Sequence, residues 1–407
     1  MVVRNLLLCQ SLIRHIMKVF LIIALLVLPS HATAQDRSGA KAGLDLGRLR
    51  AITTLLESVV KQGKMAGAVT LVARRGQVVS LQAVGYHDLE SKKPMRVDSI
   101  FDVRSVTKPI TAIAIMMLVE DGKLALNDSV AKYLPELRRT SSKAETSPDR
   151  ITIRHLLTHT AGLPFQRPPE IEDITVKRDR TLSEVVTLLA KQEPEYEPGT
   201  RFRYSSGGFA ILGRVIEVVA GKPYEQFVEQ RIFGPLGMKD SFFFIPPEKQ
   251  NRVASIYRLQ DGKLNRWNEL ETYARSAKYS APEFGLYSTA SDLASLCQMM
   301  LDGGMFKGRR ILSRLSVEEM TKNQTLNIPN AVTQIPAYQG LGWGLSGDPM
   351  NDFPLTSPGS FGHNGAFGAI VWIDPREQLI RIFLEHRFGF FTESNVFMAM
   401  AGAAVVD

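Results

Sequence analysis

The sequence predicts an α+β fold: one antiparallel β-sheet flanked by helices from both ends of the chain, together with a second, mainly helical lobe. Three observations predict it. Strand-like segments occur near both ends of the chain, helical segments stand outside them, and the middle of the chain is mainly helical in its apolar spacing. The simplest fold joins the terminal strands in one sheet, and a ligand is expected in the cleft between the two lobes.

The terminal segments supply the strands of this sheet. Residues 45–62 repeat apolar positions at helical spacing, and residues 67–88 follow as two β-rich runs with a turn at Arg75, which is typical of a hairpin. Near the other end, the runs GAIVWID and QLIRIFLEH flank a turn that begins at Asp374. Residues 392–405 predict a final helix.

The middle of the chain is divided into helices by proline and glycine. These helices are expected at residues 107–121, 181–192, 208–220, 223–231 and 291–302. Loops are expected at residues 138–149 and 322–360. The catalytic domain is expected over residues 45–407, with an α/β lobe from about 45–105 and 360–407 and a helical lobe from about 106–300.

The N-terminus predicts a signal peptide over residues 1–34. The apolar run VFLIIALLVLP follows Lys18, and a small-x-small cleavage pattern ends at Ala34. The run is shorter than the roughly 20 apolar residues of a transmembrane helix, so no integral membrane segment is expected after cleavage. Residues 35–44 are small and polar and predict a flexible leader. We therefore expect an exported protein, periplasmic or secreted.

Composition and charge disfavour nucleic acid as a partner. The chain has 407 residues, and its formal net charge of +8 comes from 49 Lys and Arg against 41 Asp and Glu. The basic residues are scattered among acids and form no stripe interleaved with aromatic residues.

Of the two cysteines, Cys9 lies in the predicted signal peptide, so we expect no internal disulfide. Cys297 is expected to be a buried core thiol.

Ser105 and Lys108, in the segment FDVRSVTKP, are the candidate nucleophile and its partner. A serine hydroxyl is a weak nucleophile at neutral pH and needs a neighbouring base. Residues three apart share a helical face, so the lysine amine can approach the hydroxyl, and a helix N-terminus adds positive potential there. Ser38 and Lys41 match the same pattern, but they lie in the predicted leader. Ser105 stands between a sheet-forming region and a long apolar helix.

Two further segments add chemistry to this pair. In RFRYSSGGFAILGRVIEVVAG, Tyr204 precedes a helix, and a tyrosine close to a cationic lysine can hold or relay a proton. In FGHNGAFGAIVWID, glycine lets a strand edge approach a substrate closely. The N–H of Ala366 could pair with that of Ser105 as an oxyanion hole. Taken singly, the two segments are also compatible with an ordinary tyrosine and a glycine-rich turn.

Together the three segments resemble the serine β-lactamase and penicillin-binding protein superfamily, closest to its class C β-lactamase-like branch and the family VIII carboxylesterases. The similarity extends from about residue 50 to 386 and includes IRHLLTHTAGLPF, FGPLGMKDSFF and GLYSTASDLASL. It implies a β-lactamase/transpeptidase-like fold in which Ser105 is acylated and Lys108 and Tyr204 transfer protons. It also implies that residues 363–366 line the strand edge of the site.

Two departures from the lactamase pattern bear on the substrate. Where the pattern has Tyr-x-Asn, this chain has Ser206, whose hydroxyl cannot offer both a carbonyl and an NH₂ group. Where it has Lys-Thr-Gly, this chain has His363, Asn364 and Gly365, and a histidine is mostly neutral at pH 7. Both changes weaken recognition of an anionic lactam and suit an uncharged ester. We expect these four residues to contact substrate, with Trp343 as an apolar wall of the cleft.

Other chemistries have weaker support. His155 and His159 have the i, i+4 spacing of metal ligands on a helix, but the glutamate of His-Glu-x-x-His is absent, and we interpret them as structural. Gly-x-Ser-x-Gly, typical of α/β-hydrolases, is also absent. No metal or organic cofactor is expected.

The sequence therefore predicts a serine hydrolase, with carboxylesterase activity on small uncharged esters as the favoured hypothesis. Two alternatives remain open. One is a β-lactamase or a D-Ala-D-Ala carboxypeptidase-like enzyme, whose lactam or peptide substrates resemble those of the superfamily. The other is a non-catalytic scaffold that binds peptidoglycan or a protein partner. The oligomeric state is not predicted.

Overall fold

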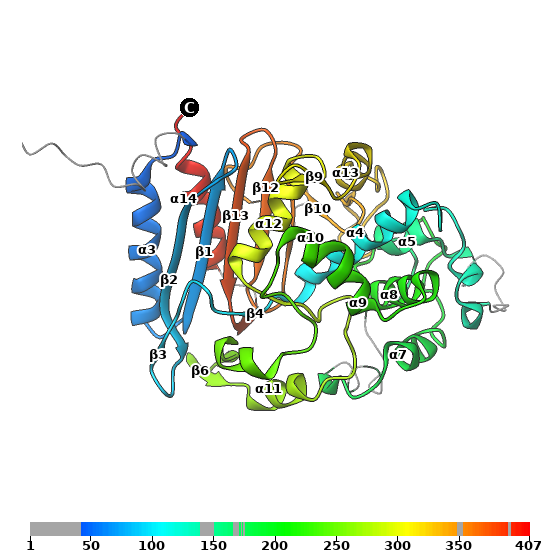
Figure 1. Ribbon diagram of the computed structural model, residues 1–407, viewed down its shortest axis with the longest axis horizontal. Coiled ribbons are helices and arrows are strands. Elements are labelled where there is room, and N and C mark those ends of the chain that lie inside the picture. The colour runs from blue at the N-terminus through cyan, green and yellow to red at the C-terminus, as the bar shows by residue number, and fades with distance from the viewer. Residues whose placement is uncertain are drawn as a thin grey trace, which may run out of the picture.

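Figure 1 shows a computed structural model of the chain, which describes residues 42–138, 150–165, 171, 173, 176–347, 353–389 and 392–407. The predicted signal peptide, most of the predicted leader and nearly all of the loop expected at 138–149 lie outside these residues. Within the described part of the chain, no helix is long and apolar enough to cross a membrane.

A seven-stranded antiparallel sheet forms the centre of the α/β lobe (Figure 1). Strand β1 from the N-terminal half pairs with β13 near the C-terminus, in register from Ala68 opposite Glu385 to Arg74 opposite Leu379. This pairing confirms that strands from both ends of the chain share one sheet. In spatial order the strands are β10 (Gly344–Leu345), β11 (Phe361–Asn364), β12 (Ile370–Asp374), β13 (Leu379–Glu385), β1 (Gly67–Arg74), β2 (Gln77–Asp88) and β3 (Lys93–Pro94).

Helices occupy most of the middle of the chain and flank the sheet at both ends of the sequence, as predicted. The helix expected at 223–231 is α-helical only over Tyr224–Val228, and the chain then continues as a π-helical turn at Glu229–Phe233 and a short α-helix at Gly234–Leu236. The helices are α3 (Leu46–Lys61), α4 (Thr107–Glu120), α5 (Ile153–Leu157), α7 (Leu182–Leu189), α8 (Ser206–Ala220), α9 (Tyr224–Val228), α10 (Gly234–Leu236), α11 (Asn268–Arg275), α12 (Ala290–Leu301), α13 (Arg314–Thr321) and α14 (Thr392–Ala403).

Both faces of the sheet are buried, because side chains alternate between the faces along each strand. Val72 and Phe383 join the core beneath α3 and α14, the helices from the two ends of the sequence, which pack on each other. Leu71 and Ile382 point the other way, into the larger core that continues into the helical lobe. Helix α12 covers this second face (Figure 1). It therefore packs on the sheet, although most of it falls within residues 106–300, where we expected the helical lobe.

Helix α4 is the central element of the helical lobe. Twelve of its 14 residues are buried, which is typical of a helix that is apolar on all sides. It packs against α8 and α9, while the 3₁₀ turn η1 (Arg104–Val106) that precedes it contacts β11 of the sheet. The N-terminus of α4 is therefore held where the two lobes meet.

Several very short strands were not predicted. Each has only two to four residues, which is too short for a periodic pattern to reveal, and some of them pair with segments far away in sequence. One pair, β4 with β7, anchors the chain immediately before η1. These strands are β4 (Phe101–Asp102) with β7 (Tyr287–Ser288), β14 (Arg387–Phe388) with β5 (Tyr257–Gln260) and β6 (Lys263–Arg266), and β8 (Met305–Phe306) with β9 (Arg309–Arg310).

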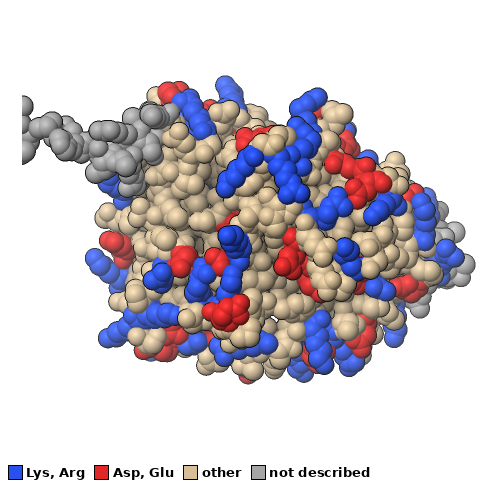
Figure 2. Space-filling model, in the orientation of Figure 1, with Lys and Arg blue, Asp and Glu red and all other residues tan. Residues whose placement is uncertain are grey.

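The surface charge is mixed rather than concentrated. On the face shown in Figure 2, lysine and arginine side chains are interspersed with aspartate and glutamate over both lobes.

Cys297 in α12 is fully buried, as expected, and burial raises the pKa of its thiol to about 12. A thiol with such a pKa is not a nucleophile at neutral pH.

Candidate active site

Ser105 and Lys108 lie in direct contact at the start of α4. Ser105 is the middle residue of η1, and the Lys108 Nζ donates a hydrogen bond of 3.1 Å to its Oγ. The same nitrogen donates to the backbone carbonyl of Glu283 at 2.8 Å. Lys108 is fully buried, so its amine is held against the serine by the surrounding core. The spacing of three residues therefore brings the two groups together as the sequence indicated.

The turn that presents Ser105 is built from the short strand pair β4–β7. Val103 N–H donates to the carbonyl of Leu286 at 3.0 Å, and Arg104 then adopts a φ of 49°. A positive φ is unfavourable for a residue with a long side chain, so neighbouring contacts must hold the turn. The carboxylate of Asp102 supplies one, since it accepts the Arg104 N–H at 3.1 Å.

The Arg104 side chain borders the same turn, although no sequence motif indicated a role for it. Its guanidinium carbon lies 3.9 Å from the ring centre of Phe367 and 5.3 Å from that of Phe284. Its Nε lies 3.4 Å from the Asp102 carboxylate. A cation stacked on aromatic rings and paired with an acid is held in one orientation. Arg104 therefore places a positive charge beside Ser105, largely offset by Asp102.

Tyr204 lies over the side-chain nitrogen of Lys108. The Nζ is 4.9 Å from the centre of the tyrosine ring, which is half-buried. Ser205 and Ser206 follow, and Ser206 opens α8. The ring of His363 approaches from the sheet, with its centre 6.2 Å from that of Tyr204. The structure thus brings residues from three distant segments to the N-terminus of α4.

His159 is a member of this cluster that sequence reasoning treated as structural. Its ring centre lies 4.4 Å from that of Tyr204, and its Nδ1 accepts the Ser205 N–H at 3.1 Å. Burial, followed by the charge of Lys108, holds the pKa of His159 well below its usual range. The neutral ring therefore carries its proton on Nε2, because Nδ1 is occupied as an acceptor.

The two histidines of the i, i+4 pair do not share a helix. His159 lies beyond the end of α5 with a φ of 57°, whereas His155 caps the start of that helix by accepting the Thr152 N–H at 3.3 Å. Among the residues that the structure describes, no cluster of three or more His, Cys, Asp or Glu could hold a metal ion.

His363 is a neutral group at the edge of β11. Its Nδ1 forms a hydrogen bond of 2.9 Å with the Asn364 carbonyl oxygen. Burial, reinforced by the charge of Lys108, lowers its pKa to about 3. At pH 7 the ring is therefore uncharged, unlike the lysine of the lactamase pattern.

Gly365 lies against the Ser105 turn, and Ala366 follows it in the chain. A Cβ on Gly365 would come within 2.3 Å of the Val103 carbonyl oxygen, so only glycine allows this close approach. Among the described residues, neither the Ser105 N–H nor the Ala366 N–H donates a backbone hydrogen bond. Both donors are therefore available for a developing negative charge.

Trp343 does not line the site, contrary to our expectation. It is fully buried, and its ring packs edge to face on Phe361 at 5.1 Å between centres. The segment around it lies within the loop expected at 322–360, but its side chains belong to the main core. A side chain with no exposed surface cannot be a wall of the cleft.

The beta-lactamase family model matches residues 52–403. The chain belongs to the beta-lactamase family. This confirms the resemblance inferred from the three motif segments, and with it the α+β fold and the general class of serine hydrolase.

Curated relatives share substantial parts of the chain. Protein Rv1367c of Mycobacterium tuberculosis is 31% identical over 356 residues, which cover 81% of this chain and 88% of that protein. Esterase EstB of Burkholderia gladioli is 35% identical over 228 residues, or 53% of this chain and 57% of EstB. A putative D-alanyl-D-alanine carboxypeptidase of Salmonella typhi is 28% identical over 312 residues, which cover 71% of this chain and 70% of that protein.

Solved structures share the fold over most of the chain. EstCE1, described as a hydrolase with promiscuous acyltransferase activity, has a TM-score of 0.74 at 26% identity and covers 91% of this chain and 99% of its own. A family VIII carboxylesterase has a TM-score of 0.71 at 23% identity, and the match covers 88% of this chain and 96% of the carboxylesterase. The second likeness shows the fold alone.

Proposed function

We propose that this protein is an exported carboxylesterase that hydrolyses small uncharged esters through an acyl-enzyme on Ser105. One observation carries the proposal: the hydrogen bond of 3.1 Å from Lys108 Nζ to Ser105 Oγ at the N-terminus of α4. A base in contact with its hydroxyl is what a serine needs to attack a carbonyl at neutral pH.

The first half of the reaction acylates Ser105. As its Oγ attacks the ester carbonyl, Lys108 and Tyr204 take the hydroxyl proton as a coupled pair. The N–H groups of Ser105 and Ala366 hold the oxyanion of the tetrahedral intermediate. The bond to the alkoxy oxygen then breaks, and the alcohol leaves with a proton relayed from the same pair.

The second half releases the acid. A water molecule attacks the acyl carbonyl and gives its proton to the same Lys108 and Tyr204 pair, and the same two N–H groups hold the second oxyanion. When the intermediate collapses, the carbonyl re-forms and the Ser105 oxygen leaves with the proton. The free hydroxyl is thereby restored.

The preference for an uncharged ester rests on the groups that would contact the substrate. His363 is neutral at pH 7, since burial and the charge of Lys108 lower its pKa to about 3. Ser206 replaces an amide with a shorter hydroxyl. The site therefore lacks two of the groups that recognise an anionic lactam in the family pattern. The names of EstB and EstCE1 support the same activity class.

A second candidate function is hydrolysis of a lactam or a D-Ala-D-Ala peptide. Arg104 favours it, because its guanidinium borders the Ser105 turn and could attract a carboxylate. The Salmonella relative carries a carboxypeptidase name. Against it, Asp102 already pairs with this arginine.

A hydrolysis panel on one purified sample tests the proposal. We expect turnover of p-nitrophenyl acetate and butyrate, much slower turnover of nitrocefin, and none of a D-Ala-D-Ala dipeptide. Ser105→Ala should abolish ester turnover, whereas Ser38→Ala, in the other Ser-x-x-Lys match, should retain it. Nitrocefin cleaved faster than the esters would favour the second candidate, and activity in Ser105→Ala would overturn both.

The location is tested on the expressed precursor. We expect cell fractionation to recover the protein outside the cytoplasm and N-terminal sequencing to find cleavage after Ala34. Recovery from the cytoplasm with an uncleaved N-terminus would contradict export. A protein that turns over no substrate and does not react with a fluorophosphonate would instead be a binding scaffold.

A further inference from the structure

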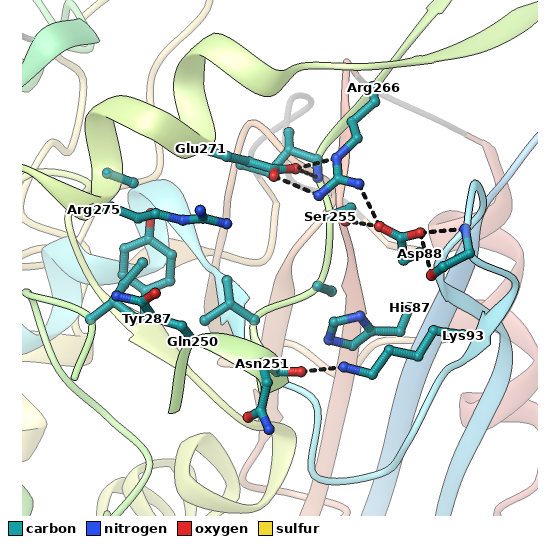
Figure 3. Close-up of a pocket in the computed structure, with 16 residues that line it drawn as sticks. His87, Asp88, Lys93, Gln250, Asn251, Ser255, Arg266, Glu271, Arg275 and Tyr287 are labelled. Carbon is teal, nitrogen blue, oxygen red and sulfur yellow. Dashed lines mark hydrogen bonds and ion pairs between the residues drawn. The ribbon is translucent and has the colours of Figure 1, made fainter. Parts of the chain in front are cut away.

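A cavity lies away from the candidate active site, beside the end of β2. Its volume is about 160 Å³, and it is enclosed by the β2–β3 end of the sheet, the 3₁₀ turn η7 (Pro247–Arg252) and α11 (Figure 3). Neither Ser105, Lys108 nor Tyr204 lines it. Any ligand bound here would occupy a site separate from the proposed chemistry.

The imidazole of His87 points into this cavity from β2 (Figure 3). The residue is 5% exposed, and neither ring nitrogen has a side-chain or backbone hydrogen-bond partner of ordinary geometry among the described residues. Burial lowers the pKa of His87, the backbone of Arg252 offsets part of this shift, and the charge of Lys93 lowers the pKa further. A buried polar ring without satisfied hydrogen bonds is costly unless a ligand or water supplies them.

The two acids that line the cavity are already satisfied. Asp88 accepts hydrogen bonds from Ser91 at 2.6 Å and Ser255 at 2.9 Å, and it pairs with Arg266. Burial alone would raise the pKa of Asp88, but these contacts lower it to about 2. Glu271 pairs with the same arginine at 2.8 Å. The single guanidinium between them offsets one of the two negative charges, so these three groups together retain one negative charge.

Two cations of the cavity wall are not neutralised in this way. The Lys93 ammonium donates to the backbone carbonyl of Asn251 and has no ion pair with any described acid. Arg275, at the end of α11, likewise forms no ion pair in the described part of the chain. In Figure 3 the Arg275 side chain and the His87 ring are directed into the space between them from opposite sides. Three cationic side chains (Lys93, Arg266 and Arg275) and two acidic ones (Asp88 and Glu271) line the cavity, so its net charge is positive.

We propose that this cavity binds a small organic carboxylate. Lys93 and Arg275 attract the carboxylate, and the neutral His87 ring donates to it from one nitrogen. The apolar part of the ligand packs on Ile245, Val253 and the small residues beside them. An engineered protein cavity of about 150 Å³ holds benzene, so this volume fits an acid of roughly the size of benzoate.

Calorimetric titration with benzoate tests the site on the protein with Ser105 blocked by a fluorophosphonate. Blocking the serine separates this site from the proposed esterase site, because a product acid could also bind there. We expect saturable binding with a Kd of about 1 mM or tighter. The double variant Lys93→Gln, Arg275→Gln should weaken binding at least tenfold. The matched double variant Lys61→Gln, Arg309→Gln, which removes two exposed charges elsewhere, should not weaken it.

Three results would overturn the inference. One is the absence of saturable binding, and another is equal affinity in wild type and the Lys93 and Arg275 double variant. The third is equal binding of inorganic phosphate, which would mark an unselective anion site. Arg275→Gln alone provides an independent test should the double variant fold poorly, because Arg275 is exposed and its replacement leaves the core intact.

Discussion

Two buried histidines near opposite edges of the sheet have the same electrostatic setting but different surroundings. His363 lies on β11 next to Lys108, and His87 lies on β2 next to Lys93. In both cases burial lowers the pKa of the histidine, and the charge of the lysine lowers it further. Each region therefore contains a neutral imidazole beside a lysine.

The difference lies in what each lysine contacts. Lys108 is fully buried, and its Nζ donates a hydrogen bond to the hydroxyl of Ser105. Lys93 is half-buried and donates to a backbone carbonyl beside a cavity. A lysine activates a nucleophile only where a hydroxyl is in reach; elsewhere the same charge can only attract a ligand.

The largest expected effect comes from removing each lysine in turn. Lys108→Met should lower kcat for p-nitrophenyl butyrate by on the order of a thousandfold or more, because Ser105 loses its base. Lys93→Met should leave kcat within about twofold, since this lysine is part of a separate cavity. Steady-state kinetics on both variants check this. Similar losses in both would remove the distinction between the regions.

A smaller loss is expected at the ring that covers Lys108. Tyr204→Phe should lower kcat by roughly 10² to 10⁴ with little change in KM, as for a lost general acid–base group. Tyr224→Phe is the matched control, because it removes a buried hydroxyl that bonds Thr111 at 2.7 Å in the helical lobe. The control should cost about 1 kcal/mol of unfolding free energy and leave kcat unchanged. A Tyr204 variant with full kcat would exclude proton transfer by this residue.

The close approach of β11 to the Ser105 turn gives a third prediction. Gly365→Ala should lower kcat by about a hundredfold, because its Cβ would meet the Val103 carbonyl oxygen and push Ala366 away from the oxyanion. Thermal unfolding should show a folded protein with a reduced Tm. An alanine variant with wild-type kcat would mean that this turn does not hold the oxyanion.

The smallest expected effect is on the pH dependence of stability. An unfolded histidine has a pKa near 6.5, and folding lowers the pKa of His363 to about 3. The unfolded state therefore binds more protons below pH 6.5, so the free energy of unfolding decreases as the pH is lowered. At pH 5 each such histidine has lowered this free energy by about 2 kcal/mol. Urea unfolding at pH 7 and pH 5 should show a smaller loss in His363→Asn.

His87→Asn sharpens the same comparison, because folding also lowers the pKa of His87. Both variants should therefore flatten the pH dependence relative to wild type, although only the histidine on β11 adjoins the proposed chemistry. Wild-type slopes in both variants would mean that the rings are not held neutral by the fold.

The sequence could predict what repeats locally. The hairpin at Arg75 and the helix that became α8 follow from regular apolar spacing, and a continuous apolar run indicated α4. The Ser-x-x-Lys pair was visible because both residues lie within one helical turn. The pairing of β1 with β13 followed from the order of elements along the chain.

Features fixed by distant contacts could not be predicted in this way. The positive φ of Arg104 depends on β4 pairing with β7, and each of those strands has only two residues. His159 looked structural because its contact with Tyr204 joins a loop to a segment more than forty residues away. Trp343 was misplaced because a glycine-rich segment gives no sign of whether its aromatic ring faces solvent or core.

The central claim, that Lys108 activates Ser105, is tested most directly by the rate of covalent labelling with a fluorophosphonate, followed by intact mass spectrometry. We predict one phosphonyl group on the wild type, mapped to Ser105 by peptide analysis, and none on Ser105→Ala. Lys108→Met should label at least about a hundredfold more slowly, and Lys93→Met should label at the wild-type rate. Labelling of Lys108→Met at the wild-type rate, or of a serine other than Ser105, would contradict the account.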